Sequence, residues 1–301
     1  MLVSPDSKFV YVTNFVTTSN TGIVQVIDTG TNTITATITV GTGALVAPSG
    51  LAITPDGQTL YVADEFGSQL WVIDTATQEV TTTLNVFAQA LAVSPDGTQL
   101  YVCNGEVSVI DTATNQITNT IGFAKTRIPW DVVFAPNGKE AYVSAKPNGY
   151  KYAKSHAYIA VIDTTTESVV SSILPTGHSY PGTEVIDANG RQLFYSQEKL
   201  IQIISTSSEN VVRTIRQNFS HGPAVITPDG KFLYMVSAIG GDTVNEVVMV
   251  DIASGKVVGK RIGLTFPTEV TIAPNGKFAY IFANVSNGGP GGMYVVDIGP
   301  S

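Results

Sequence analysis

Residues 55–75 read PDGQTLYVADEFGSQLWVIDT and carry three signals that decide the fold. The first is the turn Pro55-Asp56-Gly57, in which proline presets φ and glycine accepts a positive φ. Tyr61-Val62 follows in a β-branched and aromatic strand, and a second strand closes on Ile73-Asp74-Thr75. The Asp and Thr side chains that follow can bond backbone amides within the next turn. We therefore interpret the stretch as paired antiparallel strands.

The three signals recur seven times in the same order. The Asp or Asn of the turn stands at positions 6, 56, 96, 137, 189, 229 and 275, so the copies are 50, 40, 41, 52, 40 and 46 residues apart. The aromatic strand recurs with Tyr11, Tyr61, Tyr101, Tyr142, Tyr195, Tyr234 and Tyr280. The closing signal recurs as Ile27-Asp28-Thr29, Ile73-Asp74-Thr75, Ile110-Asp111-Thr112, Ile162-Asp163-Thr164, Ile204-Ser205-Thr206, Val250-Asp251 and Val296-Asp297.

Each copy predicts four short strands, A to D, which in the second copy are 51–54, 59–63, 70–74 and 79–86. A four-stranded unit repeated about every 40 to 45 residues is typical of a β-propeller. We expect an all-β, seven-bladed β-propeller in one domain, residues 1–301, with 27 strands. The last blade is incomplete, because the sequence ends after its third strand. We expect a segment upstream of Met1, or a neighbouring molecule, against that edge.

The motif Tyr11-Val12-Thr13-Asn14 matches the name of the YVTN-repeat (YncE-like) propellers, which this chain resembles along its whole length. Related propellers include lactone hydrolases, lactonizing enzymes and cyclases of secondary metabolism. The resemblance therefore implies a cofactor-independent lyase, isomerase, cyclase or lactonase. Many YVTN-repeat proteins are thought to be non-catalytic modules of the periplasm or cell surface, which is the alternative.

Composition limits the partners. Only 13% of residues are charged and the formal net charge is −8, which argues against a nucleic-acid partner because phosphate binding needs a basic surface. The single cysteine, Cys103, excludes an intrachain disulfide and is expected to be buried. No apolar run is long enough to span a membrane. We expect a secreted or periplasmic protein whose signal lay upstream of Met1, with a cytoplasmic location as the alternative.

Function is expected at one end of the strands. The A–B and C–D turns are short and regular, whereas the B–C and D–A loops at the opposite end absorb the length variation. Binding residues tend to lie on such loops. All three histidines, His156, His178 and His221, fall there. We interpret at least one as a proton-transfer group, since histidine titrates near neutrality. The alternative is three solvated histidines.

Three carboxylates open strand A at nearly equivalent positions: Asp131, Glu184 and Glu269. His221 stands at the same level of the sixth copy. Crowded carboxylates raise one another's pKa and become candidate general acids or bases. Alternatively, such groups tie adjacent blades together through backbone amides. The predicted catalytic set is His221, His178, Glu184, Asp131 and Glu269.

A cationic, aromatic segment lies in the fourth copy, where Lys125, Arg127, Lys146, Lys151 and Lys154 stand near Trp130 and three tyrosines. It could receive an anionic or aromatic organic ligand, or simply be a solvated loop. The predicted ligand-binding set is Trp130, Lys125, Arg127, Tyr152, His156, Tyr180 and Phe266. Asn218 and Asn284 lie in glycosylation sequons that chance alone would produce. Scattered histidines without a cysteine cluster predict no metal site, and we expect no cofactor.

Overall fold

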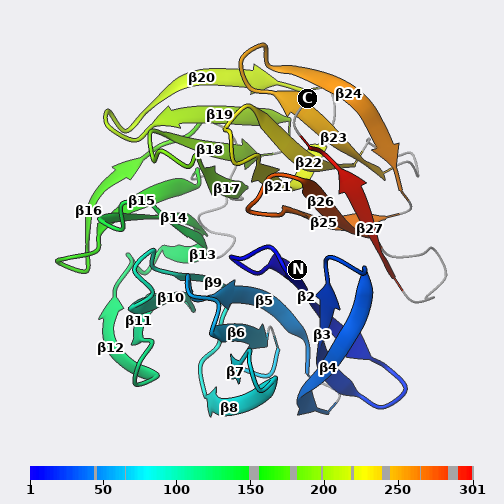
Figure 1. Cartoon of the computed structure of the whole chain (residues 1–301). Helices are drawn as coiled ribbons and strands as arrows, with labels where there is room; N and C mark the ends of the chain where they lie inside the picture. The colour runs from blue at the N-terminus through cyan, green and yellow to red at the C-terminus, as the bar shows by residue number, and fades with distance from the viewer. Residues whose placement is uncertain are drawn as a thin grey trace. The chain divides into compact units, whose positions relative to one another are not determined.

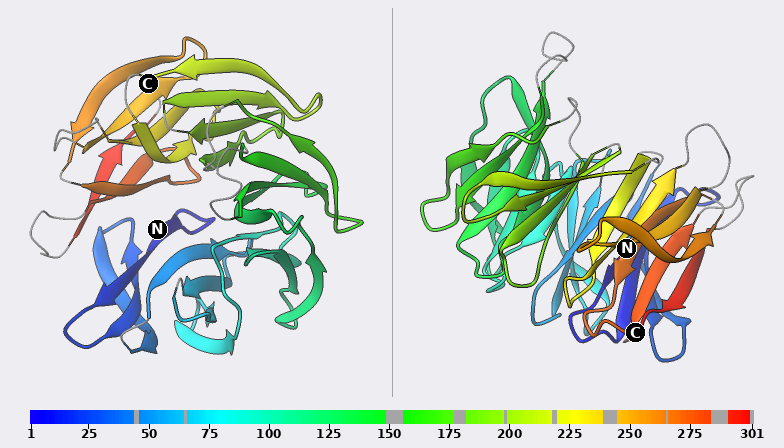
Figure 2. Two further views of the ribbon diagram at one scale, coloured as in Figure 1. Left: turned by 180° about the vertical axis from the view of Figure 1, so that it is seen from behind. Right: turned by 90° about the horizontal axis from the view of Figure 1, so that it is seen from above.

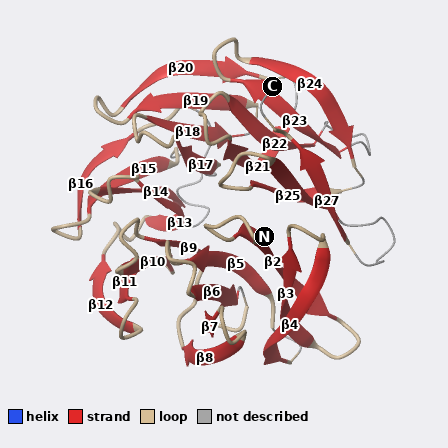
Figure 3. Ribbon diagram, viewed as in Figure 1, coloured by secondary structure: helices blue, strands red, loops and turns tan. Residues whose placement is uncertain are grey.

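The structure is a computed structural model that describes residues 1–43, 46–64, 66–148, 156–176, 182–197, 199–217, 220–238, 245–264, 266–283 and 291–299. Every regular element in these ranges is a β-strand (Figures 1 and 3). The chain divides into two compact units, residues 1–152 with 160–171 and residues 153–159 with 172–301.

The first unit holds blades 1 to 3 and most of blade 4. Each of these blades is a four-stranded antiparallel sheet whose strands follow chain order. Their strands are β1 (Leu2–Val3), β2 (Phe9–Val16), β3 (Thr21–Asp28) and β4 (Thr33–Thr42); β5 (Pro48–Ile53), β6 (Thr59–Asp64), β7 (Leu70–Asp74) and β8 (Glu79–Leu84); β9 (Ala90–Val93), β10 (Gln99–Cys103), β11 (Val107–Asp111) and β12 (Gln116–Ile121); β13 (Arg127–Phe134), β14 (Glu140–Pro147), β15 (Tyr158–Asp163) and β16 (Ser168–Ile173).

The second unit holds blades 5 to 7. Their strands are β17 (Thr183–Ile186), β18 (Gln192–Gln197), β19 (Leu200–Ser205) and β20 (Asn210–Arg216); β21 (Ser220–Ile226), β22 (Phe232–Ala238), β23 (Asn245–Asp251) and β24 (Lys256–Gly263); β25 (Pro267–Ile272), β26 (Phe278–Ala283) and β27 (Gly292–Asp297). Over the described residues there are 27 strands in six sheets of four and one of three, as predicted. The prediction of a seven-bladed β-propeller is confirmed.

Within each unit the core lies in the seams between consecutive blades. Alternate residues of a strand face the same side of the sheet, so a blade presents an apolar face to the next blade of its unit. In the second unit the inner strands β17, β21 and β25 contact one another in sequence. The seam between blades 5 and 6 is a cluster of Phe194, Ile201, Ile203, Ile215, Leu233, Met235, Val248, Val250 and Ile252. Figure 2 shows from two further sides that the strands of the sheets are twisted, as expected of such sheets.

The A–B turns are held by a side-chain pair two residues apart. In blade 2 the Thr54 hydroxyl donates to Asp56 Oδ1 at 2.6 Å and accepts the backbone N–H of Thr59 at 3.0 Å. Ser4, Ser94 and Thr227 make the same bond to their own turn aspartates. That hydroxyl is the main reason why the pKa of Asp56 lies below its ordinary value.

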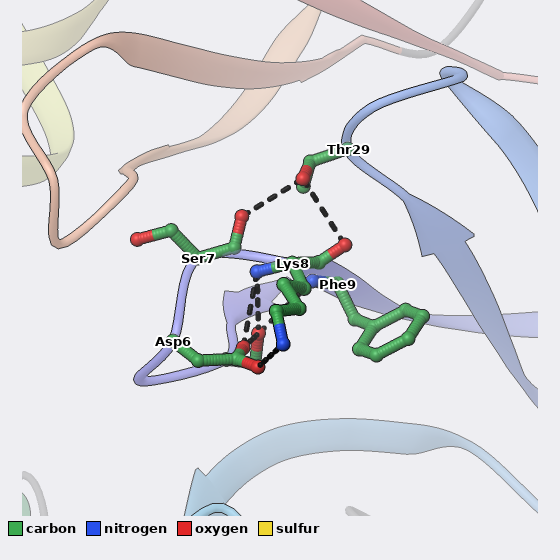
Figure 4. Close-up of polar contacts among 6 residues, drawn as sticks. Asp6, Ser7, Lys8, Phe9 and Thr29 are labelled. Atoms are coloured by element: carbon green, nitrogen blue, oxygen red, sulfur yellow. Dashed lines mark hydrogen bonds and ion pairs between the residues drawn. The ribbon is translucent and has the colours of Figure 1, made fainter.

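The C–D turns follow the Asp of the closing signal. Asp74 Oδ1 accepts the backbone N–H of Thr77 at 2.7 Å, as predicted. The threonine of the signal acts differently from the prediction, because its hydroxyl donates to carbonyls instead of meeting amides. Thr75 donates to the carbonyls of Gly57 and Gln58, at 2.6 and 3.1 Å. Figure 4 shows the counterpart in blade 1, Thr29 against the carbonyls of Ser7 and Lys8. This threonine therefore joins the C–D turn to the A–B turn.

The register corrects one assignment in blade 5. Strand A of blade 2 pairs Ala52 with Tyr61, and the same register in blade 5 pairs Val185 with Phe194. Phe194, not Tyr195, therefore occupies the repeated aromatic position. Tyr195 follows it and projects from the opposite face of the sheet.

Candidate functional site

In blade 4, Arg127 and Trp130 of the cationic, aromatic segment lie in β13 and Lys146 lies in β14, whereas Lys151 and Lys154 lie outside the described residues. Lys146 Nζ lies 3.6 Å from the centre of the Trp130 ring. Burial lowers the pKa of Lys146. The lysine therefore covers one face of the indole that was predicted to contact a ligand. Lys125 is exposed and Arg127 is half-buried.

The structure describes only some of the predicted histidines and other candidate residues. His156 is exposed just before β15. His221 is the second residue of β21, where its backbone pairs with Ser237. His178, Tyr152, Tyr180, Asn218 and Asn284 lie outside the described residues. Phe266 lies just before β25, 42% exposed and with φ of 48°.

The three predicted carboxylates do not share one position. Asp131 pairs with Ser144 and Glu269 pairs with Phe282, which stand seven residues after the turn asparagines Asn137 and Asn275. These two carboxylates are equivalent. Glu184 instead pairs with Tyr195, six residues after Asn189, and therefore projects from the opposite face of its sheet. Glu184 is 6% exposed, whereas Asp131 and Glu269 are half-buried.

Two buried polar side chains that the sequence analysis did not select hold loops in place. Asp64 is fully buried at the end of β6, and its Oδ1 accepts the backbone N–H groups of Ala47 and Phe66 at 3.0 and 3.1 Å. Gln202 in β19 is also fully buried and accepts the backbone N–H of Thr176 at 2.9 Å. Both side chains tie a loop to a blade through a backbone amide.

A further polar group lies at the long-loop end of the seam between blades 5 and 6. Ser196 stands two residues after Phe194 on β18, and Ser237 stands two residues after Met235 on β22. Phe194 and Met235 both belong to the apolar cluster of this seam, so the two serines face it from opposite sides. Glu246 pairs with Ser237 from β23 and faces the seam as well.

These three side chains are almost completely buried, with exposed fractions of 4% for Ser196, 0% for Ser237 and 5% for Glu246. Neither serine hydroxyl makes a hydrogen bond within the described residues. His221 pairs with Ser237 from the other side, so His221, Ser237 and Glu246 follow one another across three adjacent strands. We call Ser196, Ser237 and Glu246 the seam cluster.

The seam between blades 6 and 7 shows what the same positions hold elsewhere. Val236 takes the place of Ser196, and the pair Ala283 and Gly292 takes the place of Ser237 and Glu246. Val236 and Ala283 are also buried. Ser144 of blade 4 stands at the position of Ser196 and is also buried without a hydrogen bond within the described residues. The seam between blades 5 and 6 differs in carrying a serine on both of its sides.

Among the described residues, no group of three or more His, Cys, Asp or Glu could hold a metal ion. The described chain also contains no helix long and apolar enough to cross a membrane. Asp131 Oδ1 accepts the backbone N–H of the next residue, Val132, at 2.9 Å.

The chain is similar to known propeller structures. It matches Kuenenia stuttgartiensis hydrazine synthase with a TM-score of 0.79 and 20% identity, over 99% of this chain and 94% of that one. It also matches the β-propeller domain of Cps50 (Swd1) from Myceliophteria thermophila, with a TM-score of 0.78 and 11% identity, over 98% and 96% of the two chains. No family model matches the sequence. A search of curated proteins gives no match either. At these identities the likeness supports the fold alone.

Proposed function

We propose that this propeller binds a small organic molecule at the long-loop end of blades 5 and 6 and converts it without a cofactor. The observation that carries the proposal is the line of His221, Ser237 and Glu246 across β21, β22 and β23. A histidine backbone position and a buried glutamate therefore lie in neighbouring strands, at the end where ligand-binding loops are expected. The reaction class is that of a lyase, isomerase, cyclase or lactonase.

His221 is the proposed proton-transfer residue, since an imidazole can accept and return a proton near neutral pH. Glu246 is the proposed partner that stabilises positive charge formed during transfer. Glu184 belongs to a separate face of blade 5 and is kept as a second candidate. One similar structure carries the name hydrazine synthase, which is compatible with an enzymatic propeller.

The alternative function is that of a non-catalytic binding or scaffold protein of the YVTN-repeat family, which is secreted, periplasmic or at the cell surface. The observation that favours it is the use of Asp64 and Gln202, whose buried side chains hold loops through backbone amides. Asp64 and Gln202 therefore stabilise the fold, although they lie at the end of the strands where ligand-binding residues are expected.

The test is a screen of small molecules for those that raise the Tm of the wild-type protein, followed by incubation and mass spectrometry of each binder. The enzyme proposal expects one binder to be converted, and His221→Asn to slow conversion by about 10²–10⁴-fold. Asp229→Asn, at the opposite end of blade 6, is the control and should convert it at the wild-type rate. A binder recovered unchanged, with equal affinity for wild type and His221→Asn, would favour the scaffold.

A further inference from the structure

We infer that the seam cluster is a subsite for a neutral ligand bearing neighbouring hydroxyl groups, of the polyol or sugar class. The inference rests on the proposed function, because it names the kind of molecule that the long-loop end of blades 5 and 6 receives. Its basis is the pair of buried hydroxyls of Ser196 and Ser237, which make no hydrogen bond within the described residues.

A buried hydroxyl left without a partner destabilises a fold by about 1–3 kcal/mol. Such a group calls for a ligand or an ordered water as its missing partner. Single buried hydroxyls of this kind also occur among the described residues at Tyr101, Ser144 and Ser171. Here two such hydroxyls face one seam from opposite blades. The corresponding positions between blades 6 and 7 hold Val236 and Ala283, so the propeller fold does not require serine at this level.

The chemistry of the cluster selects the ligand. A serine hydroxyl both donates and accepts, whereas the Glu246 carboxylate only accepts when ionised. A ligand hydroxyl satisfies a serine hydroxyl in either role, because it too donates and accepts. An anionic ligand is disfavoured by the buried carboxylate and by the formal net charge of −8.

Apolar side chains complete the subsite. Ile201 pairs with Ser196 and is fully buried, and Met235 stands two residues before Ser237 on the same face. The polar cluster therefore adjoins the apolar core of the seam. Among the described side chains directly opposite Ser196 and Ser237 there is no Lys or Arg to attract an anion.

The experiment compares Ser196→Ala and Ser237→Ala with Ser108→Ala. Ser108 is also buried, but its Oγ accepts a hydrogen bond from Asn104 Nδ2 at 2.8 Å. We expect each seam variant to raise the Tm of the ligand-free protein by about 2 °C or more, because an unsatisfied hydroxyl is removed. Ser108→Ala should lower the Tm, because Asn104 loses its acceptor.

Binding is measured by calorimetry with D-glucose and glycerol as probes and benzoate as the anionic, aromatic comparison. We expect the wild type and Ser108→Ala to bind a polyol probe, and each seam variant to bind it at least about 10-fold more weakly, the loss of one or more hydrogen bonds to the ligand. Benzoate should not bind at this site.

Three results would overturn the inference, and the third leaves the proposed function standing. One is a fall in Tm for both seam variants, as for Ser108→Ala, which would mean that ordered water alone satisfies the hydroxyls. The second is the absence of polyol binding to the wild type. If a screened ligand is lost in His221→Asn yet binds both serine variants normally, the proposed function stands and the polyol subsite fails. If no small molecule binds at all, both fail.

Discussion

At the scale of single residues, the residue two positions before the turn Asp or Asn is related to which of the two amino acids occupies the turn. Where Ser or Thr precedes the turn, as in Thr54 with Asp56, the turn residue is an aspartate that accepts the hydroxyl. Where Ala135 precedes it, the turn residue is Asn137, whose Oδ1 accepts the backbone N–H of Lys139. A hydroxyl donor favours an ionised acceptor, so the two positions change together.

Thr54→Ala tests this pairing through pH. The Thr54 hydroxyl depresses the pKa of Asp56, so its contribution to stability is present above the unfolded pKa near 4 and is lost as pH falls through the lower folded pKa. At pH 7 the variant should lose about 1 kcal/mol of unfolding free energy. Urea denaturation should show this difference shrinking between pH 5 and 3. A difference that stays constant with pH would contradict the pairing.

The C–D turns place one residue in the left-handed region in each of six blades, and glycine fills that position only in blade 6, as Gly255. Gln78 takes it in blade 2 with φ of 61°. Gln78→Gly should raise the unfolding free energy by about 0.5–1 kcal/mol, because glycine adopts this conformation without strain. Denaturant unfolding measures the gain.

Glu167→Gly is the matched control for that substitution. Glu167 has φ of 48°, but its carboxylate accepts hydrogen bonds from Gln99 and Asn119 of blade 3 at 2.8 and 2.7 Å. The relief of strain should be offset by the loss of these bonds. Equal gains from both substitutions would mean that the inter-blade bonds contribute nothing.

At the scale of elements, the sequence predicts strands and turns well, because their signals are local. The turn motif and the aromatic strand are adjacent in the chain, and all seven sheets follow from them. The register is less certain when two aromatic residues adjoin, as Phe194 and Tyr195 do, because a shift of one residue reverses every side chain. That shift also separated Glu184 from Asp131 and Glu269.

Thr75→Val tests the link between the two turns of one blade. The variant removes the hydroxyl that donates to the carbonyls of Gly57 and Gln58, and should lower the unfolding free energy by about 1 kcal/mol. Thr83→Val on exposed β8 is the control and should change it by less than about 0.5 kcal/mol. Isoleucine already replaces this threonine in blade 6, at Ile252. If Thr75→Val proves neutral, the link is dispensable in blade 2 as well.

Strand β27 presents an unpaired edge in the described structure of blade 7. Tyr294 and Val295 are 45% and 36% exposed there, whereas the equivalent residues of β7, Trp71 and Val72, are each 2% exposed. Val295→Lys should leave the unfolding free energy within about 0.5 kcal/mol of the wild type and reduce self-association, because a charged edge strand discourages pairing.

Sedimentation at increasing protein concentration measures that association. Val72→Lys is the control for burial and should unfold the protein, because it places an unpaired charge in the core. Self-association of Val295→Lys that equals the wild type would show that the β27 edge does not mediate contact between copies.

At the scale of the whole molecule, the sequence repeat makes the fold easy to predict and the functional site hard to predict. Seven copies of one pattern identify the propeller, whereas a site is a departure from that pattern in one copy. Ser237 and Glu246 are unremarkable strand residues until their rows are compared with Ala283 and Gly292. Loop lengths alone predict which end of the strands carries the site. The residues of that end can be compared between blades only when the strand register is known.

The remaining prediction separates the two ends of one blade. In blade 6, Asp229 lies in the A–B turn, where it accepts the hydroxyl of Thr227 at 2.6 Å, and His221 lies at the opposite end. Asp229→Ala should lower the unfolding free energy by about 1 kcal/mol and leave ligand affinity unchanged. His221→Asn, and Glu184→Gln in blade 5, should impair ligand binding or turnover by far more than they change the Tm. Each variant is measured by denaturant unfolding and by calorimetry with the ligand found in the screen. If Asp229→Ala loses binding while both long-loop variants retain it, function resides at the turn end of the strands, because only that end then responds.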